Sequence, residues 1–502
     1  MTTTKSCDSS AVDDSTNAPD VGPTRKAGRP TAIVVIGCLC GISVSLTQTM
    51  IVPLNPLLPS LLGTSSSNAS WAVTATLLAA AVTLPISGRL GDMFGKRMMM
   101  LVSLAALTAG SIVCAFSDSL LPMVVGRALQ GLSVGVIALG ISIMRDELPA
   151  DRVGGGVARM SATLGVGGAV GLPVAAVVVE KANWHVLFWI TAGIGVLCFA
   201  AVLAIVPESP VRSPGRFDYL GAVGLAGGLV TLLIAITKGG DWGWSDQLTL
   251  GLVASSLVVF ASWALWETKV HAPLLDLHTA TRPPVLFTNF ASVGVGFAMY
   301  GMALVPIQLL LGPKISDYGL GLTLVQSGLV LMPGGLMMFL FSGVGARITA
   351  VRGPRASLVT GIAIMAVGYF VIILLRTQWW EISLAWAITG AGVGVAYAAM
   401  PALIMSAVPV TETAAANGLN ALMRSVGTAL SSAVVAAVLA HETMHVGGGV
   451  LPTEHGFTSA LVVSLSGCVV ALVLALLIPV KRAGVTRQPG PTEGAQQLAG
   501  SG

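Results

Sequence analysis

Long apolar runs alternate with short polar segments along almost the whole chain. A bilayer core of about 30 Å requires about 20 apolar residues per helix, and fourteen stretches meet this requirement. The pattern therefore predicts an all-α polytopic membrane protein. The predicted spans are 31–58, 70–88, 97–117, 120–144, 159–180, 184–206, 217–237, 248–267, 286–311, 322–345, 356–375, 380–404, 415–439 and 457–480.

The composition supports the same class of protein. Of the 502 residues, 54% are hydrophobic and only 10% are charged, whereas soluble domains have about 25% charged residues. The net charge of +4 is too small to indicate a nucleic-acid partner, and we expect none.

The distribution of basic residues predicts the orientation. If the N-terminus lies inside, 20 of the 26 Lys and Arg residues fall on the cytoplasmic side, as the positive-inside rule requires. Lys181, Lys238, Lys314 and Arg376 fall on the outer side, and Arg127 and Arg424 lie within spans. We therefore predict a multi-pass cell-membrane protein with both termini in the cytoplasm. The polar segments 1–30 and 481–502 are predicted to be disordered cytoplasmic tails.

A weak internal repeat divides the chain. Residues 88–97 follow the second span, and residues 346–355 follow the tenth span with a similar pattern that aligns without gaps. Internal repeats are common in transporters, which place a central site between their repeats. We expect an N-terminal six-helix bundle (31–206), an inserted helix pair (217–267) and a C-terminal six-helix bundle (286–480).

The segment from Gly88 to Arg97 is the strongest local signal. It predicts a tight two-glycine turn held in the cytoplasm by its bases, and a solvated loop would explain those bases equally well. It would not explain the acid or the glycine spacing. We expect Asp92 to meet the positive N-terminal end of the span that begins near Thr411 to Thr413 and to latch the two halves together. The proposed conformational-switch residues are Gly88, Asp92, Gly95, Lys96 and Arg97.

Arg127 lies well inside the fourth span, where a charge costs at least a few kcal/mol and needs a polar partner. Gln130 shares its helical face. We interpret Arg127 as a fixed positive charge that tunes a nearby proton-binding group, with a purely structural arginine as the alternative. Glu180, at the outer end of the fifth span, is the candidate proton carrier, although an interfacial carboxylate can simply be solvated. Asp218 and Glu267 lie at the cytoplasmic ends of the inserted pair.

Two further groups of residues are candidates. Small residues and a proline in the fifth span favour close packing and a pivot; these are Gly165, Gly171 and Pro173. Polar residues within spans could line a substrate cavity, or could equally form hydrogen bonds between helices. These are Gln48, Asn55, Asn289, Gln308, Asn417, Asn420 and Arg424.

Several functional classes are disfavoured. The segment Gly91 to Arg97 is one residue short of a phosphate-binding loop and lacks its hydroxyl, so ATP hydrolysis by this chain is not expected. No constellation of His, Asp, Glu and Ser converges at one membrane depth, which argues against an enzyme. We expect no metal and no other cofactor.

With these motifs in view, residues 31–480 resemble the fourteen-helix drug:proton antiporter branch of the major facilitator superfamily. Gly88 to Arg97 resembles its loop signature, and Arg127 with Gln130 and Gly131 resembles its fourth-helix signature. Segments typical of the branch are Phe217 to Gly221, Pro273 to Leu277, Pro306 to Gln308, and Ala416 to Asn420 followed by Arg424.

The resemblance implies a major facilitator fold and a monomeric exporter that exchanges a drug or antibiotic for protons within membrane lipid. Arg127 would act in proton coupling and the Gly88–Arg97 segment in switching, and the activity could serve antibiotic self-resistance. The branch usually has an acid in the first span where this chain has Gln48, so the proton-carrying carboxylate is unassigned. An importer or uniporter of a small metabolite on the same fold is the alternative.

Overall fold

The computed structural model describes residues 30–479, except 56, 210, 213–214, 271–272, 317 and 447–448. The predicted tails, 1–30 and 481–502, lie outside the described residues, apart from Pro30, which begins the first helix.

Fourteen spans in the described part of the chain are long and apolar enough to cross a membrane, which confirms the number predicted from the sequence. The sixth and seventh helices, α6 and α7, form one span together. The long helices are α1 (Pro30–Thr49), α4 (Trp71–Phe94), α5 (Lys96–Ala115), α6 (Leu120–Gly131), α7 (Gly135–Glu147), α8 (Ala150–Lys181), α9 (His185–Ile205), α10 (Tyr219–Trp242), α11 (Gln247–Glu267), α13 (Pro283–Leu311), α14 (Leu324–Arg352), α15 (Pro354–Leu374), α16 (Trp379–Ala407), α17 (Thr413–His441) and α18 (Glu454–Leu477).

Two predicted spans are interrupted. The first was expected to be continuous over 31–58, but α1 ends at Thr49 and is followed by the 3-10 turn η1 (Val52–Leu54) and by α2 (Leu58–Leu61). Pro53 lies within η1, and a proline lacks the N–H that would continue the helix. The fourth span contains the 3-10 turn η2 (Leu132–Val134) between α6 and α7.

Short elements outside the spans were not predicted. Strands β1 (Thr443–Val446) and β2 (Gly449–Pro452) form an antiparallel hairpin before α18. Four-residue helices α3 (Ser66–Ala69) and α12 (Leu277–Ala280) precede α4 and α13, and the 3-10 turn η3 (Val410–Glu412) leads into α17. Elements of three or four residues carry too few periodic positions to be recognised from the sequence.

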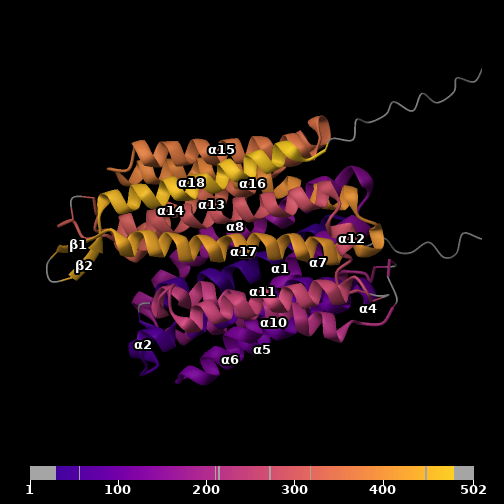
Figure 1. Cartoon of the computed structure of the whole chain (residues 1–502), viewed down its shortest axis with the longest axis horizontal. Coiled ribbons are helices and arrows are strands. Elements are labelled where there is room, and N and C mark those ends of the chain that lie inside the picture. The colour runs from indigo at the N-terminus through magenta and orange to yellow at the C-terminus, as the bar shows by residue number, and fades with distance from the viewer. Residues whose placement is uncertain are drawn as a thin grey trace, which may run out of the picture.

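The spans form two six-helix bundles with an inserted pair beside them (Figure 1). The bundles meet where α4 packs against α17 and where α8 packs against α14. The inserted helices α10 and α11 pack against each other, and α10 also contacts α4 and α17. Large apolar side chains on α11, such as Leu250, Leu257 and Val258, remain exposed, as expected for a helix that faces lipid.

Candidate functional site

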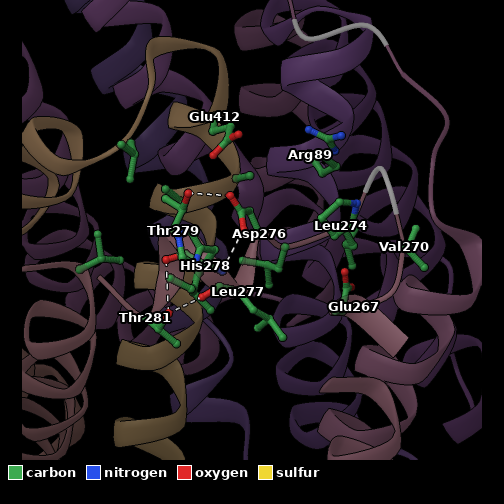
Figure 2. A pocket seen from close by; sticks show the side chains of 18 of the residues that line it. Arg89, Glu267, Val270, Leu274, Asp276, Leu277, His278, Thr279, Thr281 and Glu412 are labelled. Carbon is green, nitrogen blue, oxygen red and sulfur yellow. Dashed lines mark hydrogen bonds between the residues drawn. The ribbon is translucent and has the colours of Figure 1, made fainter. Parts of the chain in front are cut away.

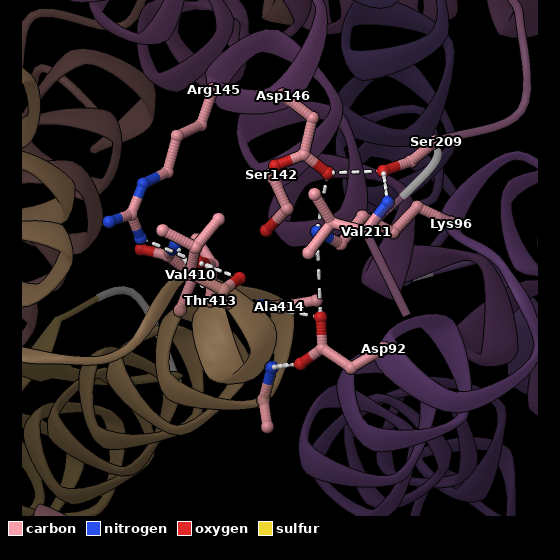
Figure 3. A network of polar contacts seen from close by, with 12 residues as sticks. Asp92, Lys96, Ser142, Arg145, Asp146, Ser209, Val211, Val410, Thr413 and Ala414 are labelled. Atoms are coloured by element: carbon pink, nitrogen blue, oxygen red, sulfur yellow. Dashed lines mark hydrogen bonds and ion pairs between the residues drawn. The ribbon is translucent and has the colours of Figure 1, made fainter. Parts of the chain in front are cut away.

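A buried charged cluster joins the two bundles at one end of the α4–α17 seam (Figure 3). Asp92, which is 1% exposed, accepts hydrogen bonds from the backbone N–H groups of Ala414 (3.3 Å) and Ala415 (2.9 Å). These amides lie in the first turn of α17, where unpaired N–H groups and the helix dipole favour an anion. The structure therefore has the contact that the sequence predicts for Asp92.

Lys96 and Asp146 complete the cluster on the N-terminal side. Lys96 Nζ lies 2.6 Å from Asp146 Oδ2 and 3.6 Å from Asp92 Oδ1, and all three side chains are fully buried. Ser209 Oγ also donates to Asp146 Oδ2, at 2.6 Å. The alternative interpretation, a solvated loop, does not fit Lys96, because Asp92 and Asp146 pair with its charge and make burial tolerable.

Arg145 adds a second connection between the bundles. It donates to Thr413 Oγ1 at 2.5 Å and to the carbonyl oxygen of Met405 at 3.0 Å. It thereby links the end of α7 to the end of α16 and the start of α17. The sequence analysis did not single out Arg145 or Asp146, although an adjacent base and acid directly after an apolar span was a usable signal.

The glycine segment has a different form from the predicted loop. Helix α4 continues to Phe94 and α5 begins at Lys96, so Gly95, with φ +120°, is the single residue between them. Gly88 is helical, and a Cβ there would lie 2.5 Å from the carbonyl oxygen of Ala414. Arg97 ties the start of α5 to the end of α9 and the residues after it. Its backbone N–H donates to Glu208 Oε1, and its Nη2 donates to the Leu203 carbonyl oxygen. The two glycines therefore serve two purposes, a close helix contact and a turn.

Replacing Gly88 with leucine is expected to separate α4 from α17 at this end. The new side chain would overlap the backbone of Ala414, and overpacking of this kind costs about 1–3 kcal/mol. Cross-linking between cysteines introduced at the facing ends of α4 and α17, in a background without native cysteines, should slow about tenfold or more. Gly154→Leu is the matched control, because nothing lies within 4 Å of a Cβ at that position. Equal cross-linking in both variants would contradict the close contact.

A second polar cluster surrounds Arg127 within the first bundle. The side chain is 1% exposed and donates to the carbonyl oxygens of Ala72 (3.2 Å) and Thr47 (3.2 Å) and to Gln130 Oε1 (2.7 Å). Gln130 in turn donates to Ser111 Oγ at 2.9 Å. The described ion pairs do not include Arg127, so neutral oxygen atoms satisfy its charge.

Glu180 is not part of this cluster. It lies exposed near the end of α8, and no described ion pair joins it to Arg127. The structure therefore brings together two of the three residues assigned to proton coupling and leaves the third apart. The described acids with buried side chains include Asp92, Asp146 and Glu267, which lie near span ends.

The predicted cavity residues do not form one site. Asn420 donates to Asn289 Oδ1 at 3.0 Å and to Ser292 Oγ at 2.8 Å, which is a hydrogen bond network between α17 and α13. Asn417 donates to the Thr413 carbonyl, while its own Oδ1 lacks a hydrogen bond. The remaining candidates are dispersed, with Gln48 and Gln308 half-buried, Asn55 exposed, and the guanidinium of Arg424 4.6 Å from the ring centroid of Tyr397.

The small residues of α8 lie against helices on both sides. A Cβ at Gly165 would lie 2.7 Å from Met338 of α14, and a Cβ at Gly171 would lie 2.0 Å from Thr49 of α1. Pro173 faces Gly328 of α14. Helix α8 therefore makes the second close contact between the bundles. Among the described residues, no group of three or more His, Cys, Asp or Glu side chains is arranged to hold a metal ion.

Comparisons with known proteins agree on one family. The family model described as Major Facilitator Superfamily matches residues 37–432 and, in a second alignment, 286–500. The Tetracenomycin C resistance and export protein of Streptomyces glaucescens is 28% identical over 419 residues, covering 82% of this chain and 76% of that protein. Multidrug resistance protein 3 of Bacillus subtilis is 25% identical over 419 residues, covering 81% of this chain and 79% of its own length.

A solved structure has the same fold. The human organic anion transporter MFSD10 (TETRAN) superposes with a TM-score of 0.61 at 16% sequence identity, covering 90% of this chain and all of that one.

Proposed function

This chain belongs to the Major Facilitator Superfamily and is a multi-pass membrane transport protein, and from that premise we propose that it exports a drug or antibiotic in exchange for protons. Two relatives are named for resistance to tetracenomycin C and to multiple drugs. At 25–28% identity they support export of a small molecule and leave its identity open.

The observation that carries the proposal is the Asp92 cluster. It joins the bundles through a few charge-assisted hydrogen bonds to the first turn of α17, which a modest change in free energy can break or restore. Alternating access requires contacts of this kind at one end of the molecule, because the bundles must separate there in one half of the cycle. By the positive-inside rule we place this end, and both termini, on the cytoplasmic side.

Arg127 is our candidate for the proton-coupling group. It is a buried charge bound by neutral oxygens from α1, α4 and α6, so protonation or a charged substrate nearby would change its surroundings strongly. One charge crossing 100 mV is worth about 2.3 kcal/mol. One proton per cycle would therefore support roughly fifty-fold accumulation against a gradient, before any pH difference is added.

Export can be tested by expressing the chain in a bacterium that lacks its major drug pumps. We expect raised resistance to at least one compound in a drug panel and lower intracellular accumulation of that compound. An uncoupler should restore accumulation to the level of cells with the empty vector, because it removes the proton gradient. Higher accumulation on expression would instead indicate import, and export that persists with the uncoupler would contradict proton coupling.

A further inference from the structure

A cavity of about 910 Å³ lies beside the Asp92 cluster (Figure 2). Its described walls are residues 267–268, 270 and 273–281, the start of α13 and the first turns of α17, with Arg89 of α4 on one side. The volume lies within the range of small-molecule sites, about 300–1,000 Å³. The lining residues do not include Asp92, Lys96 or Arg127.

Glu267 is the unexplained residue in its wall. This last residue of α11 is 4% exposed, and neither of its carboxylate oxygens has a hydrogen bond. Figure 2 shows the carboxylate directed toward Leu274. The backbone N–H groups of Leu274 and Leu275 and the indole of Trp263 lie near it, but none of them forms a hydrogen bond of good geometry with it. An unpaired buried carboxylate costs several kcal/mol, so a partner that the chain itself does not provide would stabilise it.

The other acids nearby increase the need for a cation. A Cβ at Gly221 would lie 2.4 Å from Asp218 Oδ2 and 2.7 Å from Glu267 Oε1, so the two carboxylates approach each other beside this glycine. Asp276 also lines the cavity and is already bound by Thr279 Oγ1 (2.7 Å) and the N–H of His278 (2.8 Å). Burial acts to raise the pKa of Asp276, but these hydrogen bonds hold it below its usual value, so this carboxylate stays ionised at neutral pH.

Bases are fewer than acids around the cavity. Among the described lining residues, Glu267, Asp276 and Glu412 are acids, and Arg89 and His278 are bases. Arg282 lies near Glu412 from outside the lining, and the described ion pairs do not include Arg89. The remaining lining is largely apolar and includes Leu274, Leu275, Val285 and Leu419. A complementary ligand thus has one cationic group and an apolar body.

We propose that this cavity binds an amphiphile with a primary ammonium group, which pairs with Glu267 while the apolar body lies against Leu274, Leu275 and Leu419. A free alkylammonium compound and the ethanolamine headgroup of a membrane lipid share this chemistry. Ala415 lines the cavity and its N–H donates to Asp92, so the ligand contacts the same helical turn that receives the Asp92 carboxylate.

Calorimetric titration of the purified full-length protein with octylammonium tests the site. Octanol and octanoate, which have the same chain without the cation, should not bind there. Glu267→Gln should weaken octylammonium binding about tenfold or more, because it removes the charge that the ammonium needs. Asp151→Asn is the matched control, since that acid is exposed at the start of α8. Equal affinity in wild type and Glu267→Gln, or equal binding of octanol, would overturn the proposal.

A second variant covers the case in which Glu267→Gln fails to fold. Leu277→Trp fills the cavity from the half-buried first residue of α12 and leaves Glu267 in place, so it should also abolish octylammonium binding. Unchanged binding in a folded Leu277→Trp protein would place the ligand elsewhere and overturn the proposal. Because the assay measures binding alone, its outcome is independent of whether the chain exports drugs.

Varying the lipid composition distinguishes a free amine from a lipid headgroup as the source of the ammonium group. Wild-type protein in nanodiscs of phosphatidylethanolamine and in nanodiscs of phosphatidylcholine should bind octylammonium equally if the ligand is a free amine. If the lipid headgroup occupies the site, affinity should fall in phosphatidylethanolamine, and that lipid should co-purify with wild type and not with Glu267→Gln. Either result supports the ammonium site, whereas lipid retention and octylammonium affinity that are both independent of Glu267 would refute it.

Discussion

Replacing Arg127 with alanine is expected to abolish the drug resistance that the wild-type chain confers, while the protein still reaches the membrane. The substitution removes the fixed charge and leaves the carbonyls of Thr47 and Ala72 and the amide oxygen of Gln130 without their donor. Each unsatisfied buried group costs about 1–3 kcal/mol, but the spans remain apolar enough to insert. Minimum inhibitory concentrations, with membrane-fraction immunoblots beside them, measure both effects.

Arg127→Lys separates the charge from the hydrogen bonds. Lysine keeps the positive charge, but its ammonium group lacks the planar fork that reaches the acceptors on α1, α4 and α6. Partial resistance in Arg127→Lys would indicate that coupling depends on the positive charge. Loss of all resistance in this variant would indicate that coupling depends on the hydrogen bonds of the guanidinium. Arg159→Ala, which removes an exposed charge from α8, should keep wild-type resistance. Full resistance in Arg127→Ala would remove this residue from the mechanism.

The sequence was sufficient for features that depend on local composition. The fourteen spans follow from apolar length alone, since the bilayer sets the requirement. Asp92 contacts the start of α17, where its two hydrogen-bond donors, Ala414 and Ala415, lie 322 and 323 positions further along the chain. It was predictable because an acid among bases is unusual and a helix N-terminus is its natural partner.

Features that depend on packing between distant residues were missed. Lys96 and Arg97 are adjacent bases that the sequence does not distinguish. Only the fold places Asp146, 50 positions further along the chain, beside Lys96. Glu267 looked like an ordinary acid at the end of a span, and only the fold shows that its carboxylate is buried without a hydrogen bond. The prediction of a turn at Gly88 was wrong for a related reason. Gly88 lies within α4, and its lack of a side chain allows the close contact with α17.

Asp92→Asn is expected to slow export about tenfold without changing which drugs are recognised. Asparagine preserves the size of the side chain but has a single acceptor oxygen. One of the two hydrogen bonds from Ala414 and Ala415 is therefore lost, and the other loses its charge assistance. That loss weakens the contact between α4 and α17 at this end by about 1.5 kcal/mol. Efflux rates from preloaded cells, measured for several drugs, test this prediction. A changed drug spectrum would argue that Asp92 contacts substrate and would contradict its role in closing this face.

A double-mutant comparison shows whether Asp92 and Arg145 act on the same element. Arg145 binds Thr413 in the turn that presents its amides to Asp92, so the two substitutions should couple and their effects should not add. Arg145→Ala alone should also slow efflux, and adding it to Asp92→Asn should cost less than the product of the two single effects. Asp151→Asn, an exposed acid on the same side of the membrane, should change neither the rate nor the effect of Arg145→Ala. Strict additivity would mean that the two residues act on separate parts of the cycle, because a single closing contact can be lost only once.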